Sequence, residues 1–359
     1  MPDTHQRPIG ERIDWLFDLA RRHGQVFCGP EATLARARYL SRHTTAMVAL
    51  KCMDGRINIP VATQTPTGIV MPFRNLGGIF DLGWPHLGEV LQHHVMGMID
   101  QGRCVLLLIT YHYSKGDSKR GCAGFHFNKQ AALDHTWQIR EQVTHIFGQS
   151  HESVYPLVCG FETDEDAITL HSHVGGPTLN LSDFVGADEK VMAFELATLL
   201  PDMPDEMRMD LLPLLMGNLS HVQQVRQQNE QQLRLLDIEH REWMICLGRG
   251  FDWLHTPNLA LIIGPYSPNL AHPIQTAAQI IDDNMRAGRI PSDGFLLLAS
   301  VPYDQVGVDR ARAELKARFL AQFAGQVIGE QLPALADKMH VRTAVLDWRS
   351  RKLEALPEN

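Results

Sequence analysis

The sequence predicts an α/β protein with a mostly parallel sheet flanked by helices, and three observations carry this prediction. The chain has 359 residues, of which 44% are apolar, so it can bury a core and is long enough for two domains. From residue 44 onward, short β-branched and leucine-rich runs alternate with helical patterns, as they do around parallel sheets. A similar order of runs returns in the last third of the chain.

Residues 1–43 are predicted to form a helical N-terminal segment. One helix is expected over Ile9–His23, and a second is expected to open at Gly29-Pro30-Glu31. Proline suits the first turn of a helix, and glutamate suits its positive end.

Residues 44–204 are predicted to form the first α/β domain. Its expected buried strands are Ala46–Leu50, Cys104–Tyr111, Val154–Phe161 and Ala167–His171. The stretches Trp84–Gln101 and Lys129–Phe147 space their apolar residues as helices do, so they are expected to cross between strands.

Residues 205–245 are predicted to be a helical connector, and residues 246–359 a second α/β repeat. The connector helix is expected over Asp205–Arg241, and a break at Pro213 stays open. The repeat has expected strands at Leu259–Gly264 and Phe295–Ser300, followed by a helix over Val308–Val327.

The two halves align as follows. Strand Cys104–Tyr111 and helix Lys129–Phe147 match Phe295–Ser300 and Val308–Val327, while Ala46–Leu50 matches Leu259–Gly264. The second half has Pro265-Tyr266 and Pro302-Tyr303 where the first half has cysteine and histidine. The sequence therefore predicts a fused pseudo-dimer whose second half is degenerate and lacks metal ligands.

Charge and apolar patterning exclude several classes of protein. The net charge of −8 is spread along the chain, which argues against a nucleic-acid partner. No apolar run reaches the 18 or so residues of a membrane span, and the first residues lack the apolar stretch of a signal peptide. We therefore expect a cytoplasmic protein without a membrane partner, whose six cysteines are thiols.

Three side chains at predicted strand ends or in the loop beyond them have the chemistry of a zinc site. They are Cys52, His112 and Cys122, and open α/β sheets place ligands at the carboxyl ends of their strands. A catalytic zinc takes three protein ligands and leaves one position for water. Either water or Asp54 completes the zinc shell. A purely structural zinc would more often show paired Cys-x-x-Cys motifs, which this chain lacks.

Asp54 and Arg56 supply a carboxylate and a guanidinium beside the first cysteine. They are two residues apart, so the guanidinium can hold the carboxylate in a bidentate contact and keep it ionised. The held carboxylate can then orient a zinc-bound hydroxide by accepting its proton.

Together with the segment Arg74-Asn75-Leu76-Gly77, these motifs resemble the β-class carbonic anhydrases. That class has the ordered pattern Cys-x-Asp-x-Arg, Arg-Asn-x-Gly, histidine and cysteine. Nine residues separate His112 from Cys122, where the ordinary β class has two. The long loop and the Cys-x-Asp-Gly-Arg motif make the chain most similar to the carboxysomal shell carbonic anhydrases, over about residues 44–330. In that family, too, the second half is a degenerate copy.

The resemblance implies a zinc-dependent lyase that hydrates carbon dioxide to bicarbonate. It implies that Cys52, His112 and Cys122 bind zinc and that Asp54 and Arg56 form the catalytic dyad. Arg74 and Asn75 either support a turn or contact substrate.

The sequence leaves the roles of several side chains around these motifs open. The charged side chains of the loop, Lys115, Asp117, Lys119 and Arg120, are expected to be solvated, with gating or attraction of bicarbonate as the alternative. His126 and His135 are candidate proton shuttles, because imidazole titrates near neutrality.

The functional alternatives are hydrolysis of carbonyl sulfide or carbon disulfide, and a catalytically silent zinc-stabilised scaffold or bicarbonate sensor. The family has a longer N-terminal region than the 43 residues here, so association with a carboxysome stays open. A homo-oligomer is compatible with the sequence.

Overall fold

The computed structural model describes residues 3–230, 239–251, 253–254, 256 and 258–357. The chain divides into two compact units. Unit 1 comprises Met1–Leu34, Met53–Arg56 and His240–Asn359, and unit 2 comprises Ala35–Cys52 and Ile57–Glu239. No helix among the described residues is long and apolar enough to cross a membrane.

The N-terminal segment contains the two predicted helices. Helix α1 spans Ile9–Cys28 and α2 spans Pro30–Arg42, with Gly29 between them. The predicted start at Pro30 is confirmed, whereas α1 runs five residues beyond the predicted His23. The buried side chains of α1 include Ile9, Ile13, Leu16 and Ala20, which recur at helical spacing, and α1 packs on strands of unit 1.

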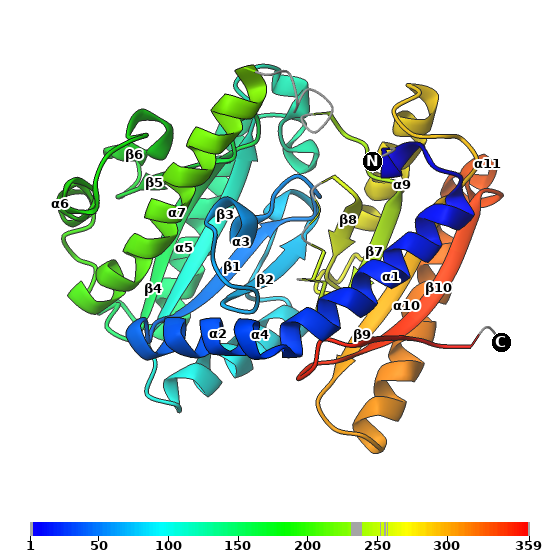
Figure 1. Ribbon diagram of the computed structural model, residues 1–359, viewed down its shortest axis with the longest axis horizontal. Coiled ribbons are helices and arrows are strands. Elements are labelled where there is room, and N and C mark those ends of the chain that lie inside the picture. The colour runs from blue at the N-terminus through cyan, green and yellow to red at the C-terminus, as the bar shows by residue number, and fades with distance from the viewer. Residues whose placement is uncertain (1–2, 231–238, 252, 255, 257, 358–359) are drawn as a thin grey trace. The chain divides into compact units, whose positions relative to one another are not determined.

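Unit 2 is built on a six-stranded sheet in the order β2-β1-β3-β4-β5-β6 (Figure 1). Its strands are β1 Ala46–Cys52, β2 Val70–Asn75, β3 Val105–Tyr113, β4 Val154–Glu162, β5 Ala167–His171 and β6 Thr178–Asn180. The pairings from β2 through β4 are parallel, and the pairings of β5 with β4 and β6 are antiparallel. The predicted α/β class and the mostly parallel sheet are confirmed.

The helices of unit 2 cover both faces of this sheet. They are α3 Ile59–Ala62, α4 Pro85–Ile99, α5 Lys129–Phe147, α6 Glu189–Leu199 and α7 Asp205–Glu230. Helix α5 packs against β3 and β4, while α7 packs against β5 and α3. Short 3₁₀ turns occur at Leu76–Gly78, Ser118–Arg120, Ala123–Phe125 and Leu181–Asp183. Helix α7 continues through Pro213, and the part of the predicted connector over 231–238 lies outside the described residues.

Unit 1 has its own five-stranded sheet in the order β11-β10-β9-β7-β8. Its strands are β7 Met244–Gly248, β8 Ala260–Ile263, β9 Phe295–Tyr303, β10 Met339–Asp347 and β11 Leu353–Ala355. Its other helices are the 3₁₀ turn Thr4–Gln6, α9 Ala271–Arg286, α10 Val308–Gln331 and α11 Pro333–Ala336. Only the edge pairing of β10 with β11 is antiparallel.

The strand orders correct the predicted alignment of the two halves. By position in its sheet, β1 matches β7, whereas β8 matches β2. Pairing Ala46–Leu50 with Leu259–Gly264 was therefore wrong by one strand. The sequence analysis missed β7, because this short run follows polar residues and was placed in and just after the connector. It also missed β2, which contains Pro72, and β10, whose apolar residues alternate with polar ones.

Candidate metal centre

Two neighbouring parallel strands of unit 2 bring Cys52 and His112 to one edge of the sheet. Cys52 is the last residue of β1, and His112 is the last but one of β3. The two strands pair in parallel up to Leu50 and Ile109, so their carboxyl ends lie side by side. Cys122 reaches the same edge from the loop after β3 and stands directly before the 3₁₀ turn Ala123–Phe125.

These three residues form a compact group of metal-ligating side chains. One ligand atom from each, two Sγ atoms and one imidazole nitrogen, lies within 4.8 Å of the others. The three residues are buried, with 5%, 2% and 2% of their surface exposed. Two thiols and an imidazole are soft and borderline donors of the kind that zinc prefers, and a three-residue set leaves a fourth tetrahedral position. The donor chemistry therefore fits zinc.

A glycine turn packs behind this group. The 3₁₀ turn Leu76–Gly78 has positive φ at Gly77 and Gly78, a backbone conformation that glycine adopts readily. A Cβ atom on Gly78 would lie 3.0 Å from the Thr110 carbonyl oxygen and 3.5 Å from the Cys52 nitrogen. A Cβ on Gly124 would lie 2.7 Å from the Gly77 Cα. The backbone after Cys122 thus touches the turn directly.

Arg74 and Asn75 end the strand that leads into this turn, and both are buried. The Asn75 side-chain amide donates to the Ile79 carbonyl at 2.8 Å, so it closes the turn. Of the two predicted roles of Asn75, this contact favours support of the turn. Substrate contact by Arg74 stays a prediction.

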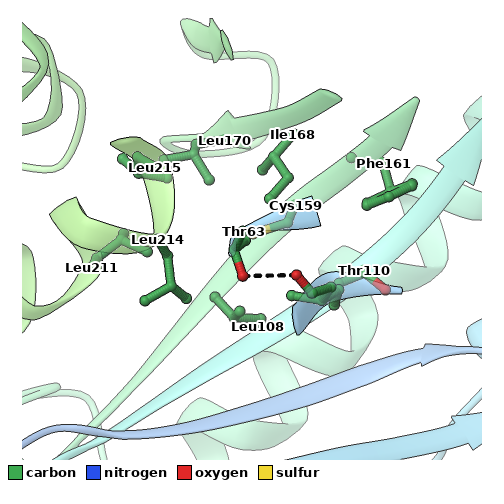
Figure 2. A pocket seen from close by; sticks show the side chains of 12 residues that line it. Thr63, Leu108, Thr110, Cys159, Phe161, Ile168, Leu170, Leu211, Leu214 and Leu215 are labelled. Atoms are coloured by element: carbon green, nitrogen blue, oxygen red, sulfur yellow. Dashed lines mark hydrogen bonds between the residues drawn. The ribbon is translucent and has the colours of Figure 1, made fainter. Parts of the chain in front are cut away.

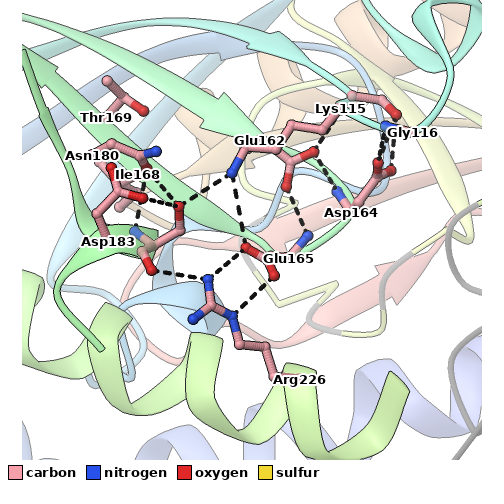
Figure 3. A network of polar contacts seen from close by, with 12 residues as sticks. Lys115, Gly116, Glu162, Asp164, Glu165, Ile168, Thr169, Asn180, Asp183 and Arg226 are labelled. Carbon is pink, nitrogen blue, oxygen red and sulfur yellow. Dashed lines mark hydrogen bonds and ion pairs between the residues drawn. The ribbon is translucent and has the colours of Figure 1, made fainter. Parts of the chain in front are cut away.

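The loop between His112 and Cys122 is held by carboxylates of the β4–β5 turn (Figure 3). Asp164 accepts hydrogen bonds from the Ser114 hydroxyl at 2.9 Å and from the Gly116 backbone N–H at 2.7 Å. Glu162 accepts the Lys115 backbone N–H at 2.9 Å and has no exposed surface. Burial raises the pKa of Glu162, although the backbone N–H groups that it accepts oppose this shift.

Of the loop's charged residues, Arg120 is less solvated than expected, whereas Lys115, Asp117 and Lys119 are exposed as predicted. Arg120 lies 3.7 Å from Asp164 and 3.5 Å from Glu239, and its side chain is only 18% exposed. The Lys115 ammonium donates to the Ser182 hydroxyl at 3.2 Å. Arg120 therefore links the loop to the β4–β5 turn, while the half-exposed Lys115 side chain contacts the 3₁₀ turn after β6.

In unit 1, Asp54 and Arg56 make the predicted bidentate contact. Arg56 Nη2 lies 2.6 Å from Asp54 Oδ2, and Arg56 Nε lies 3.1 Å from Asp54 Oδ1. The Arg56 backbone N–H also donates to Asp54 Oδ1, at 2.8 Å. Both residues are 4% exposed, so the pair is shielded from water.

Gly55, between Asp54 and Arg56, lies where a larger residue would not fit. Met53 and Gly55 accept backbone hydrogen bonds from Ile262 and Asn258, which seats this segment along β8. A Cβ on Gly55 would lie 2.5 Å from the Ala260 carbonyl oxygen. A larger residue would therefore push the segment away from its strand neighbour.

Sequence reasoning missed two residues that contact the dyad, His240 and Glu242. Arg56 Nη2 lies 2.9 Å from His240 Nε2, and His240 Nδ1 lies 3.0 Å from the Glu242 carboxylate. Because a guanidinium only donates, His240 Nε2 must accept, and its Nδ1 then carries the proton donated to Glu242. Burial raises the pKa of Glu242, but His240 and Arg56 outweigh it and the pKa lies below its usual value.

Asp54, His240 and Glu242 also offer ligand atoms within 4.8 Å of one another. The positive guanidinium of Arg56 bonds to both Asp54 and His240, so this group is a hydrogen-bonded chain centred on Arg56. No local sequence motif predicts this hydrogen-bonded chain, because His240 and Glu242 appear in the sequence only as a histidine two residues before a glutamate.

The other histidines have different surroundings. His135 Nε2 accepts the Phe80 backbone N–H at 3.2 Å, and burial lowers the pKa of His135. His126 is exposed and caps the 3₁₀ turn after Cys122 with positive φ. A shuttle role for either one stays a prediction.

The fold and the buried Cys–His–Cys group together define an α/β domain with a candidate metal site. Residues 40–195 match the family described as "Carboxysome Shell Carbonic Anhydrase, catalytic domain". It is 27% identical over 236 residues to a "Carboxysome shell carbonic anhydrase" from Prochlorococcus marinus (strain MIT 9313). It is 28% identical over 251 residues to a protein of the same name from Halothiobacillus neapolitanus (strain ATCC 23641 / c2). Each match covers 58% of this chain and 45% or 48% of the relative, so the chain spans about half their length.

Proposed function

We propose that this chain is a zinc-dependent carbonic anhydrase that interconverts carbon dioxide and bicarbonate. The observation that carries the proposal is the buried group Cys52, His112 and Cys122, within a segment that matches the family's catalytic domain. Zinc held by these three side chains would lower the pKa of a coordinated water toward neutrality and so supply hydroxide.

The dyad has a defined task in this proposal. Arg56 keeps Asp54 ionised and fixes both its oxygens, so the carboxylate is available to accept a proton from the attacking water. Asp54 is two positions after Cys52, so covalent geometry alone keeps their Cα atoms within about 7 Å. His240 and Glu242 act through Arg56 as positioning residues, because His240 accepts from Arg56 and Glu242 holds the imidazole of His240 in place.

We also propose that the chain is a fused pseudo-dimer in which, among the described residues, the Cys–His–Cys group belongs to unit 2 and is not repeated in unit 1. The order β8-β7-β9-β10-β11 in unit 1 matches β2-β1-β3-β4-β5 in unit 2. Where β1 ends at Cys52, β7 ends at Gly248, and where β3 carries His112 near its end, β9 carries Pro302. Glycine and proline have no side-chain atom that ligates zinc, so these positions of unit 1 do not repeat the ligands of unit 2.

The test combines metal analysis with stopped-flow carbon dioxide hydration. We expect one zinc per wild-type chain, and loss of both zinc and activity in Cys52→Ser and His112→Ala. Cys246→Ser is the matched control, since Cys246 is a fully buried thiol in β7 outside the group, and it should keep both. Stoichiometric zinc in Cys52→Ser would contradict the ligand assignment.

Arg56→Ala separates the dyad from the metal. We expect this variant to keep zinc while its rate falls, because Asp54 loses the group that orients it. A normal rate would remove the dyad from the mechanism. Bound zinc with no wild-type rate above background would favour the silent scaffold or sensor. Turnover of carbonyl sulfide or carbon disulfide in place of carbon dioxide would favour the hydrolase.

The cellular setting is tested separately. The relatives are named as carboxysome shell proteins. Cofractionation of this chain with carboxysomes, as opposed to recovery in the remaining cytoplasm, would decide whether it shares that location. Its mass in solution would decide whether it forms a homo-oligomer.

A further inference from the structure

A small cavity lies inside unit 2, between the sheet and the helices α3 and α7 (Figure 2). Its volume is about 20 Å³. Strands β3, β4 and β5 contribute Leu108, Cys159 and Leu170 to its wall, and α7 contributes Leu214. A cavity of this size holds about one small molecule, since a single water needs roughly 10–15 Å³ by the same measure.

The polar atoms around this cavity are engaged elsewhere. The Thr63 hydroxyl donates to the Ile59 carbonyl at 2.7 Å, and the Thr110 hydroxyl donates to the Leu50 carbonyl at 2.9 Å. The Cys159 thiol contacts the Leu157 carbonyl at 3.7 Å, and burial raises the pKa of this thiol well above its usual value. A water inside would therefore find too few hydrogen-bond partners, and a cavity of this kind favours an apolar guest.

The cavity lies on the face of the sheet that carries the candidate metal ligand of β3. Side chains two residues apart on a strand point to the same face, so Leu108, Thr110 and His112 share one side of β3. The Tyr111 side chain lies on the opposite side of the sheet, where its ring contacts His171 of β5. The step from Thr110 to His112 along the strand is about 7 Å.

We propose that this cavity is a holding site for one molecule of carbon dioxide. The inference rests on the function proposed above. Carbon dioxide is small, linear and apolar, it donates no hydrogen bond, and it gains by leaving water for a dry apolar space. A molecule held there lies beside Thr110, two residues before the candidate ligand His112 on β3, and in this proposal it passes from there to the centre.

Crystals of the zinc-loaded protein under xenon pressure, and separately under carbon dioxide pressure, test for occupancy. We expect density for each gas in the cavity. Leu214→Phe should fill the space and abolish both densities. Leu212→Phe is the matched control, because Leu212 is also a buried leucine of α7 but does not line the cavity. Leu214→Ala should enlarge the cavity and raise xenon occupancy. This variant tests the cavity if Leu214→Phe does not fold.

Kinetics then connect the cavity to turnover. We expect a severalfold lower kcat/KM for hydration in Leu214→Phe than in Leu212→Phe, with kcat and zinc content unchanged. Absence of both gases from wild-type crystals, or equal kcat/KM in the two variants, overturns the holding site while leaving the anhydrase intact. Xenon density in a zinc-loaded protein that hydrates no carbon dioxide overturns the proposed function instead, and with it the identity of the guest.

Discussion

Replacing Gly124 with alanine should disrupt the metal centre without touching a ligand. The added Cβ would lie 2.7 Å from the Gly77 Cα and 2.9 Å from the Gly77 nitrogen, whereas ordinary contact begins at 3.4 Å. Both neighbours are backbone atoms of a glycine turn, so no side chain can rotate away. One of the two segments must therefore move by about 0.7 Å, the difference between 3.4 and 2.7 Å.

That displacement is large for a metal site. Zinc–ligand distances hold within about 0.2 Å, and Cys122 is only two residues from Gly124. We expect the zinc affinity of Gly124→Ala to fall at least tenfold and carbon dioxide hydration to fall with it. Such overpacking typically costs about 1–3 kcal/mol of folding free energy.

The assay is competition for zinc with a chromophoric chelator, alongside urea unfolding. Gly97→Ala is the control, because a Cβ at this position in α4 meets nothing within 4 Å. Alanine there should leave zinc affinity unchanged and stabilise the helix by up to about 1 kcal/mol. Equal zinc affinity in Gly124→Ala and Gly97→Ala would refute the packing argument.

Three further predictions concern unit 2. Asn218 is fully buried, accepts from the Ile168 backbone N–H and donates to the Ala62 and Asp166 carbonyls, so Asn218→Ala should cost about 2–4 kcal/mol in urea unfolding. A loss below about 0.5 kcal/mol, the range of surface changes, would count against that network. Burial, aided by the charge of Lys129, lowers the pKa of His171 from 6.5 to about 4, so between these values the unfolded chain binds a proton that the folded chain does not. Stability should therefore fall as pH drops from about 6.5 to about 4, by on the order of 3 kcal/mol relative to His171→Gln; parallel pH profiles for the two proteins would contradict the shift. Asp164→Asn should loosen the loop before Cys122, because the carboxylate's charge faces Arg120 and both its oxygens accept from Ser114, and chelator competition should show weaker zinc binding, roughly tenfold. Unchanged zinc affinity there would mean that the loop is positioned by other contacts.

Much of the fold follows from local patterns in the sequence. Short apolar runs such as those of β3 and β4 favour buried strands, and α5 and α10 follow from apolar residues at helical spacing. The pattern fails at β2 and β10, because a proline or alternating polar residues hide a strand whose identity comes from its neighbours.

The sequence by itself determined the chemistry of the candidate site. Two thiols and an imidazole are zinc donors wherever they meet, and Asp54 and Arg56 are close enough in the chain to pair without further help. Only the tertiary structure decided that His240 and Glu242 extend this pair, that Gly77 and Gly124 touch, and that a cavity lies beside β3. These features join residues far apart in the chain, and such contacts leave no periodic signal because they depend on how the layers of the fold pack.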